Sequence, residues 1–506
     1  MPEEFHSNSH YNLSVFISAI IWTVVIYFIL SGSATIFEVD SYYHIRLADI
    51  MAKYGLILPS EFPWTACAIW NNAFFDKEWL FHVILIPLIK LGGELVGCKI
   101  FILTSVFLCA IAWGSLLKVL RIKYPFFVLL LIIFASGPAF ASRLLMCRPH
   151  LLSIMLFAIF LICLVKNKRV LIFCVSYIYA LSYTGCWQIV PIAILYDLIT
   201  LWHSKERKGW KNWLSIYTFS GITAGMIINP YFPFNISGLY IQNIMILKAA
   251  ILGGTLYRLD LGMELYPPAL IKIFTNYLLL FILNATAFIS LLENRKTVRD
   301  FQLKLFFGCL SLTYMILTIL VVKFTDYFVP LAVVFLILYF QDKITAWNKR
   351  FFLLIVIAIL LISFGIFSAL ALKKEIYQKN IRYYDSANWI NQTVELQRDI
   401  MHPQKLIFTS SWDDPPYLFY SLPNFKYLVF LDPYFMYSHS PDKYRMWQKI
   451  AEGKTNNPAL LIQQEFGTNI VFVNSRHKAL QIQLEESECA KLKFEGKNGE
   501  KVFILK

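Results

Sequence analysis

An acidic pair gives the sequence its most reactive short motif. The segment FEVDSYYHIRLADIMAKYG (37–55) places Glu38 and Asp40 two residues apart, directly after a long apolar run, with His44 and Arg46 following. Carboxylates at a membrane boundary are costly unless they are paired or used, and the chemistry of a used carboxylate is proton transfer. The alternative is that Asp40 caps the following helix and Glu38 is solvated.

Cationic side chains form a second candidate group. The segment SRLLMCRPHLLS (142–153) carries Arg143, Arg148 and His150 between two apolar blocks. A guanidinium group binds phosphate through a forked pair of N–H donors, so a phosphate-bearing lipid would account for them. Binding of a lipid headgroup without chemistry is the alternative.

Four further segments carry polar residues that belong to a site only if they lie near the acidic segment 37–55 and the cationic segment 142–153. For each of them a salt bridge, a helix cap, a turn or an interfacial anchor is at least as typical as a site. They are Asp76, Glu78 and His82 in FFDKEWLFH (74–82), Glu264 in LGMELYPP (261–268), Lys323 and Asp326 in KFTDYFVP (323–330), and Trp412, Asp413 and Asp414 in TSSWDDPPYLFY (409–420), with FLDPY (430–434) close by.

The elements that position these residues are predicted to be membrane helices. Of the 506 residues, 58% are hydrophobic and 15% charged, whereas a soluble domain has about 25% charged residues. Eleven apolar runs are long enough to span a bilayer. They are 11–31, 95–117, 125–141, 150–165, 170–184, 187–202, 214–229, 269–292, 304–323, 327–341 and 352–372. The first is too long for a signal peptide and lacks basic residues before it, so it is predicted to be retained.

The distribution of cations predicts the orientation. The net charge of +14 resides in short clusters between apolar blocks, a pattern typical of membrane topology and not of nucleic-acid binding. If the apolar stretch 79–91 does not cross, all five clusters share one face, which the positive-inside rule makes cytoplasmic. The N-terminus is then cytoplasmic, and two long loops, 32–94 and 230–268, lie outside. The clusters are Lys118/Arg121/Lys123, Lys166/Lys168/Arg169, Lys205/Arg207/Lys208/Lys211, Arg295/Lys296/Arg299 and Lys343/Lys349/Arg350.

The C-terminal part, 373–506, reads as a separate domain. Short β-rich runs at 406–410, 427–431, 469–473 and 501–505 alternate with amphipathic helical stretches at 386–395, 441–452 and 456–466. This alternation predicts a small α/β domain with a mostly parallel sheet, placed outside the membrane. The fold class expected is therefore an α-helical polytopic membrane domain, 1–372, followed by a soluble extracytoplasmic α/β domain. The nine cysteines show no disulfide or zinc spacing.

The order of these motifs resembles the GT-C superfamily of membrane glycosyltransferases, in particular the catalytic subunit of oligosaccharyltransferase and its bacterial relatives. The resemblance implies a bacterial inner-membrane enzyme that takes sugar from a polyprenyl-phosphate or -diphosphate carrier. It makes Asp40 the principal catalytic or metal-binding carboxylate, with Glu38 beside it and Glu264 approaching the reaction centre. The sugar acceptor is left open among glycan, lipid and protein.

Two departures from that superfamily bear on the mechanism. SSWDDPPY stands where oligosaccharyltransferases carry Trp-Trp-Asp-Tyr-Gly, which puts sequon glycosylation in doubt. Where those enzymes carry a second acidic motif, this sequence has Arg143, Arg148 and His150. This difference weakens the prediction of a bound Mg²⁺ or Mn²⁺ ion. The cationic side chains could neutralise the phosphate instead.

The mechanism expected from these residues is displacement at the anomeric carbon. Asp40 deprotonates or orients the acceptor, and Arg148, Arg143 or Lys323 stabilises the leaving phosphate. A transporter or flippase for lipid-linked sugars, and a retired binding subunit, are the competing hypotheses. The enzyme hypothesis requires Asp40, Asp76 or Glu78, Arg148, Glu264 and the 412–414 segment to converge on one cavity.

Overall fold

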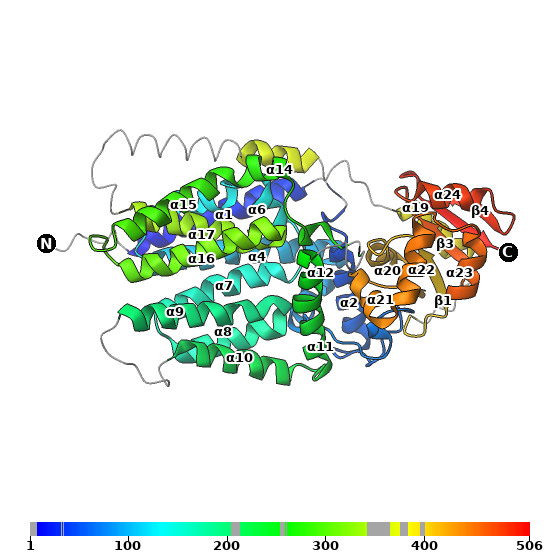
Figure 1. Cartoon of the computed structure of the whole chain (residues 1–506), viewed down its shortest axis with the longest axis horizontal. Helices are drawn as coiled ribbons and strands as arrows, with labels where there is room; N and C mark the ends of the chain where they lie inside the picture. The colour runs from blue at the N-terminus through cyan, green and yellow to red at the C-terminus, as the bar shows by residue number, and fades with distance from the viewer. Residues whose placement is uncertain are drawn as a thin grey trace.

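A long helical bundle and a smaller α/β unit make up the molecule (Figure 1). The structure, a computed structural model, describes residues 8–31, 33, 35–203, 213–252, 259, 261–341, 365–374, 383–394 and 400–506. The predicted basic clusters at 205–211 and 343–350, and most of the predicted span 352–372, lie outside these residues.

The bundle consists of apolar helices that run along the long axis of the molecule (Figure 1). Six helical stretches of the described chain are long and apolar enough to cross a membrane: Ser9–Leu30, Glu94–Val119, Thr184–His203, Leu270–Glu293, Phe301–Leu320 and Val322–Phe340. The apolar helices Pro125–Phe134, His150–Val165, Arg169–Ser182 and Leu214–Ile228 are shorter. The chain is therefore an integral, multi-pass membrane protein, and the number of eleven spans stays a prediction.

The bundle helices follow the predicted apolar blocks closely because each block is bounded by a polar or basic connection. The predicted block 125–141 is divided in two by a turn at Gly137, where φ is positive. The helices are α1 (Asn8–Leu30), α4 (Glu94–Val119), α5 (Pro125–Phe134), α6 (Pro138–Arg143), α7 (His150–Val165), α8 (Arg169–Ser182), α9 (Ile189–His203), α10 (Leu214–Ile228), α15 (Leu278–Glu293), α16 (Phe301–Leu320) and α17 (Thr325–Phe340).

The two long loops hold short helices at the end of the bundle that faces the α/β unit (Figure 1). The first loop contains α2 (Asp40–Tyr54), η1 (Ile69–Asn71) and α3 (Trp79–Gly92). Helix α3 turns back on α4 so tightly that a Cβ at Gly97 would lie 2.5 Å from the Leu88 carbonyl oxygen. That α3 lies in the outer leaflet without crossing remains a prediction. The second loop and the segments beside it contain α11 (Phe234–Tyr240), η4 (Ile241–Met245), α12 (Ile246–Leu252), η5 (Met263–Leu265), α14 (Leu270–Lys272) and η6 (Ile273–Tyr277).

The α/β unit contains a five-stranded sheet in the order β2-β1-β3-β5-β4. Strand β1 pairs in parallel with β2 and β3, whereas β5 pairs antiparallel with β3 and β4. The expectation of a mostly parallel sheet is corrected to a mixed one, because the short connection 496–500 joins β4 and β5 as a hairpin. The strands are β1 (Lys405–Thr409), β2 (Phe425–Tyr427), β3 (Ile470–Val473), β4 (Ala490–Glu495) and β5 (Lys501–Leu505).

Helices cover the sheet much as the amphipathic pattern predicts. The predicted stretches 386–395, 441–452 and 456–466 are helical almost throughout, while α20, α21 and α24 were not predicted. Strand β3 is buried along its whole length, as its continuous apolar sequence requires. The helices are α19 (Tyr384–Thr393), α20 (Pro415–Ser421), α21 (Pro433–His439), α22 (Pro441–Ala451), α23 (Pro458–Phe466) and α24 (Lys478–Glu485).

The first loop fastens the α/β unit to the bundle. Tyr427 of β2 donates its N–H to the Trp64 carbonyl at 2.8 Å, and the Ala66 N–H donates to the Tyr427 carbonyl at 2.8 Å. The loop thus adds a short bridge to the free edge of β2. On the neighbouring helix α2, Arg46 donates two hydrogen bonds to the Tyr420 carbonyl of α20, at 3.0 and 2.6 Å. These contacts hold the two parts in a fixed register.

Candidate active site

A cavity of about 350 Å³ lies where the helical bundle, both long loops and the α/β unit meet. Seven segments of the bundle and its loops contribute to it: the start of α2, residues 77–78 before α3, the 143–150 connection, η2 (Thr184–Gln188), η4, η5, and η7 (Val322–Phe324) with the start of α17. The α/β unit contributes the loops that follow β1 and β2, as expected for ligand sites in open α/β sheets. The cavity is therefore built from segments far apart in sequence.

Most of the residues proposed from sequence lie on this one cavity. Asp40 and Arg148 both line it and contact each other, and both long loops contribute carboxylates. The predicted residues that line it are Glu38, Asp40, His44, Glu78, Arg143, Arg148, His150, Glu264, Lys323, Trp412 and Asp413.

Arg148 stands at the centre of three carboxylates. Its Nη2 is 3.3 Å from Asp40 Oδ2, and its Nη1 is 3.8 Å from Glu38 Oε1. Both guanidinium nitrogens bond Glu264, each N–O distance being 3.1 Å. The predicted cation is thus placed among the acidic groups, in the two-pronged geometry that carboxylates and phosphates share.

Arg143 supports this group from behind. It binds Asp326 in a fork, with Nε–Oδ1 at 2.8 Å and Nη2–Oδ2 at 3.1 Å, and its Nη1 is 2.7 Å from Glu264 Oε2. Asp326 is buried in the first turn of α17 and does not line the cavity. Glu264 therefore bridges two arginines, which fixes the second long loop over the 143–150 connection.

The three carboxylates differ in proton affinity. Burial, followed by the neighbouring Glu38 carboxylate, raises the pKa of Asp40 well above its ordinary value. Burial likewise raises the pKa of Glu38. For Glu264 burial acts in the same direction, but Arg148 and Arg143 prevail and hold its pKa well below the usual range. Burial thus favours the neutral forms of Glu38 and Asp40, whereas the two arginines favour the charged form of Glu264.

Two histidines and an aspartate form a buried chain beside Asp40. His44 Nδ1 lies 2.9 Å from His82 Nε2, and His82 Nδ1 lies 2.7 Å from Asp76 Oδ2. Asp76 also accepts the Glu78 N–H at 3.0 Å. Of the three, His44 is the one that lines the cavity. Asp76 therefore reaches the cavity only through the histidines.

The α/β unit supplies an aspartate cluster whose members have different roles. Asp413 lines the cavity and pairs with Arg476 at 2.5 Å. Asp414 points into the unit, where it accepts hydrogen bonds from Tyr383 and Asn474, both at 2.9 Å. Burial raises the pKa of Asp414 to about 8, and that of the cavity-lining Asp432 to about 7. Asp414 is accordingly a structural group, and Asp432 belongs to the cavity.

Arg46 is the other proposed residue that lies off the cavity. Its guanidinium contacts Glu94 at 2.8 Å and Asp49 at 2.9 Å, besides the Tyr420 carbonyl. These partners join α2 to α4 and α20. The side chain thus serves the assembly of the site, and we remove it from the proposed contact set.

Sequence inspection missed one wall of the cavity. Asn243 of η4 donates to the Thr184 carbonyl of η2 at 3.1 Å, which brings the two short helices together. The sequence feature that could have indicated this wall is the presence of Trp187, Gln188 and Gln242 in otherwise apolar segments. The cavity residues not proposed from sequence include Lys77, Tyr183, Thr184, Trp187, Gln188, Gln242, Asn243 and Asp432.

The donor set of the cavity does not fit a divalent ion. Each of its three neighbouring carboxylates, Glu38, Asp40 and Glu264, already lies within 4 Å of the Arg148 guanidinium. Within the described ranges, no group of three or more His, Cys, Asp or Glu side chains is arranged to hold a metal. The mechanism below is therefore built on cations of the chain.

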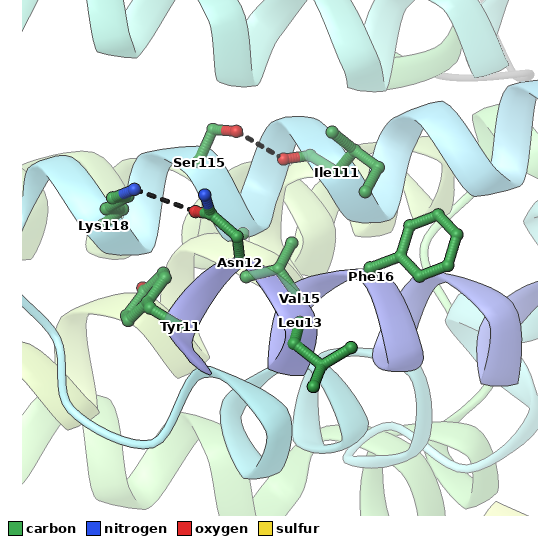
Figure 2. A pocket seen from close by; sticks show the side chains of 9 residues that line it. Tyr11, Asn12, Leu13, Val15, Phe16, Ile111, Ser115 and Lys118 are labelled. Atoms are coloured by element: carbon green, nitrogen blue, oxygen red, sulfur yellow. Dashed lines mark hydrogen bonds between the residues drawn. The ribbon is translucent and has the colours of Figure 1, made fainter. Parts of the chain in front are cut away.

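A second hollow, between α1 and α4, carries no comparable chemistry (Figure 2). It is lined mainly by apolar side chains, and its polar contacts are a 2.8 Å bond from Lys118 to Asn12 and a 2.8 Å bond from Ser115 to the Ile111 carbonyl. It contains no carboxylate. Lys118 is useful below as a cation remote from the candidate site.

The arrangement of membrane helices, two site-forming loops and a C-terminal α/β unit is similar to that of solved oligosaccharyltransferase and ArnT structures, so the GT-C-like fold expected from the sequence is confirmed. The oligosaccharyltransferase of Archaeoglobus fulgidus in its apo form has a TM-score of 0.63 at 11% identity, covering 99% of this chain and 75% of that one. ArnT from Cupriavidus metallidurans bound to undecaprenyl phosphate has a TM-score of 0.53 at 12% identity, covering 98% of both chains. No family model and no curated protein matches the sequence.

Proposed function

We propose that this protein is a membrane glycosyltransferase that moves a sugar from a polyprenyl-phosphate or -diphosphate carrier to an acceptor at the outer face of the membrane. The observation that carries the proposal is the convergence of Asp40, Arg148 and Glu264 on one cavity between apolar helices and an α/β unit. A donor with a lipid tail and a polar, phosphorylated head requires such a mixed environment.

Ligands of fold neighbours support a lipid-phosphate donor. ArnT was crystallised with undecaprenyl phosphate, and the archaeal oligosaccharyltransferase AglB with an inhibitory peptide and a dolichol-phosphate. In this chain Arg148 places a positive charge on the cavity wall, and Lys77 and Lys323 add two cations to the same lining. These groups would balance the charge that develops on the departing carrier phosphate.

The carboxylates would act on the other reactant. Asp40 would accept a hydrogen bond from the acceptor nucleophile and orient it toward the anomeric carbon. Its partly exposed side chain, 18% accessible, is open to such a contact. Glu264 would hold Arg143 and Arg148 in position, so that the cations are already placed when the bond to phosphate breaks.

The proposed orientation follows the described basic connections. The connections after α4, α7 and α15 lie at the end of the bundle away from the α/β unit (Figure 1). By the positive-inside rule this end is cytoplasmic, and the α/β unit, 373–506, is extracytoplasmic. A bacterial inner membrane is the proposed location.

Mass spectrometry of surface glycans and of lipid-linked sugars, in cells with and without the protein, tests the function. We expect loss of the protein to remove one glycan modification and to enrich one lipid-linked sugar. Re-expression of the wild type or of Lys118→Gln should restore both. An unchanged glycan and lipid profile would contradict the proposal, and restoration by Asp40→Ala would favour a transporter or binding subunit.

A further inference from the structure

The chain Asp76–His82–His44 has a single hydrogen-bond direction when the His82 ring is neutral. An ionised carboxylate only accepts hydrogen bonds, so Asp76 Oδ2 receives the proton on His82 Nδ1. In the neutral ring of His82, Nε2 is then an acceptor, and His44 Nδ1 must donate to it across 2.9 Å. The remaining ring nitrogen of His44, Nε2, therefore carries a lone pair.

That lone pair belongs to the cavity side of the chain. The side chains of Asp76 and His82 are buried, at 2% and 1% exposure. Asp76 bonds His82, and the other ring nitrogen of His82 bonds His44. His44 lines the cavity, and the described residues give its Nε2 no hydrogen-bond partner. A bound molecule would thus meet one unprotonated nitrogen, whose tautomer is set from behind.

We infer that His44 is the general base of the proposed transfer and that His82 and Asp76 are its positioning residues. This inference rests on the proposed function. Asp40 is less suited to the role because its Oδ2 lies 3.3 Å from Arg148, whereas His44 has no Lys or Arg as a direct partner among the residues that the structure describes. Burial, followed by His82, Arg148, Lys77 and His150, lowers the pKa of His44, which keeps the ring unprotonated at neutral pH.

The proton and electron pairs balance as follows. The O–H or N–H bond of the acceptor breaks, and its proton moves to His44 Nε2. The electron pair freed on the nucleophile forms the bond to the anomeric carbon. The carbon–oxygen bond to the carrier breaks, and its electron pair leaves on the polyprenyl phosphate or diphosphate, facing Arg148. The imidazolium then returns its proton to water.

Reaction of the full-length protein with diethyl pyrocarbonate tests the tautomer directly, without knowledge of the sugar. An unprotonated imidazole nitrogen attacks a carbonyl carbon of the reagent, and peptide mass spectrometry locates the adduct. We expect His44 to be modified, and Asp76→Asn to slow that modification, because an amide at position 76 no longer requires the proton of His82 to reside on Nδ1. The exposed His439 of α21 is the internal reference and should react equally in both proteins. No adduct at His44, or equal rates in the two proteins, would overturn the relay.

A turnover experiment tests the base role. In membranes that carry His44→Ala, release of free polyprenyl phosphate should fall about 10²–10⁴-fold, the usual contribution of a general base. Added imidazoles should restore part of it, more strongly as the pKa of the added base rises. A loss that no imidazole restores would overturn the base role. If the wild type and Asp40→Ala release polyprenyl phosphate equally, the proposed function fails instead, while the pyrocarbonate result still stands.

Discussion

Replacing one partner of the forked salt bridge between Arg143 and Asp326 should strongly lower the free energy of unfolding. Both side chains are buried, at 9% and 2% exposure, and two N–O contacts of 2.8 and 3.1 Å join them. Breaking a buried pair by removing one partner costs about 3–5 kcal/mol. For Asp326→Asn we expect about 3 kcal/mol, the low end, because Arg143 keeps Glu264 at 2.7 Å.

The double variant separates the charge from the packing. In Arg143→Met/Asp326→Leu no unpaired charge is left buried, so stability should return to within about 1 kcal/mol of the wild type. Glu264 keeps its two bonds to Arg148. Equilibrium unfolding of the full chain in mixed detergent micelles is measured for the four proteins of the cycle: the wild type, Arg143→Met, Asp326→Leu and the double variant. A coupling energy below about 0.5 kcal/mol, the level of independent sites, would refute the reasoning.

Three further predictions follow from the same contacts. Arg148→Gln should weaken binding of undecaprenyl phosphate about 10–100-fold, because a charged hydrogen bond contributes about 1.5–3 kcal/mol. Native mass spectrometry measures this affinity. The control Lys118→Gln should bind undecaprenyl phosphate normally, because Lys118 bonds Asn12 away from the candidate site. Arg46→Met should lower stability by about 1–3 kcal/mol in micelle unfolding yet leave that affinity unchanged, since its partners are Glu94, Asp49 and the Tyr420 carbonyl; a weakened affinity would return Arg46 to the site. The pKa of Asp414 is raised from an ordinary 3.8 to about 8, so between these pH values the folded protein holds a proton that the unfolded chain does not. The free energy of unfolding should therefore fall as pH rises from about 4 to 8, and Asp414→Asn should flatten this dependence. An equal slope in both proteins would contradict this prediction.

Local patterns predicted the elements well because each depends on neighbours in sequence. Apolar runs between basic connections gave the bundle helices, and alternation gave most of the α/β unit. Strand β4 escaped because its AKLKFE sequence is mostly exposed, so it lacks the apolar signal of a buried strand. The mixed sheet escaped because strand direction is set by connection geometry, which composition does not report.

The candidate site was predictable in its charges and not in its pairings. We predicted Asp40, Arg148 and Glu264 from the sequence because ionised groups at a membrane boundary are energetically costly unless they are paired or functional. That Asp326 lies behind Arg143, or that Asp414 turns inward to Tyr383, depends on tertiary contacts between distant segments. The polar wall of η2 and η4 lacked charge, and uncharged amides in an apolar run carry little signal on their own.

Turnover of a lipid-linked sugar by an Asp40 variant is the sharpest test of whether this protein transfers sugar at the candidate site. The two proteins to compare are Asp40→Ala and Asp49→Ala, which alter aspartates of the same helix α2; Asp49 pairs with Arg46 and Lys53 and does not line the cavity. In cells that lack the native protein, we expect Asp49→Ala to restore release of polyprenyl phosphate and the glycan product, whereas Asp40→Ala, present in the membrane at equal amount, should restore neither. Normal transfer by Asp40→Ala would contradict the account.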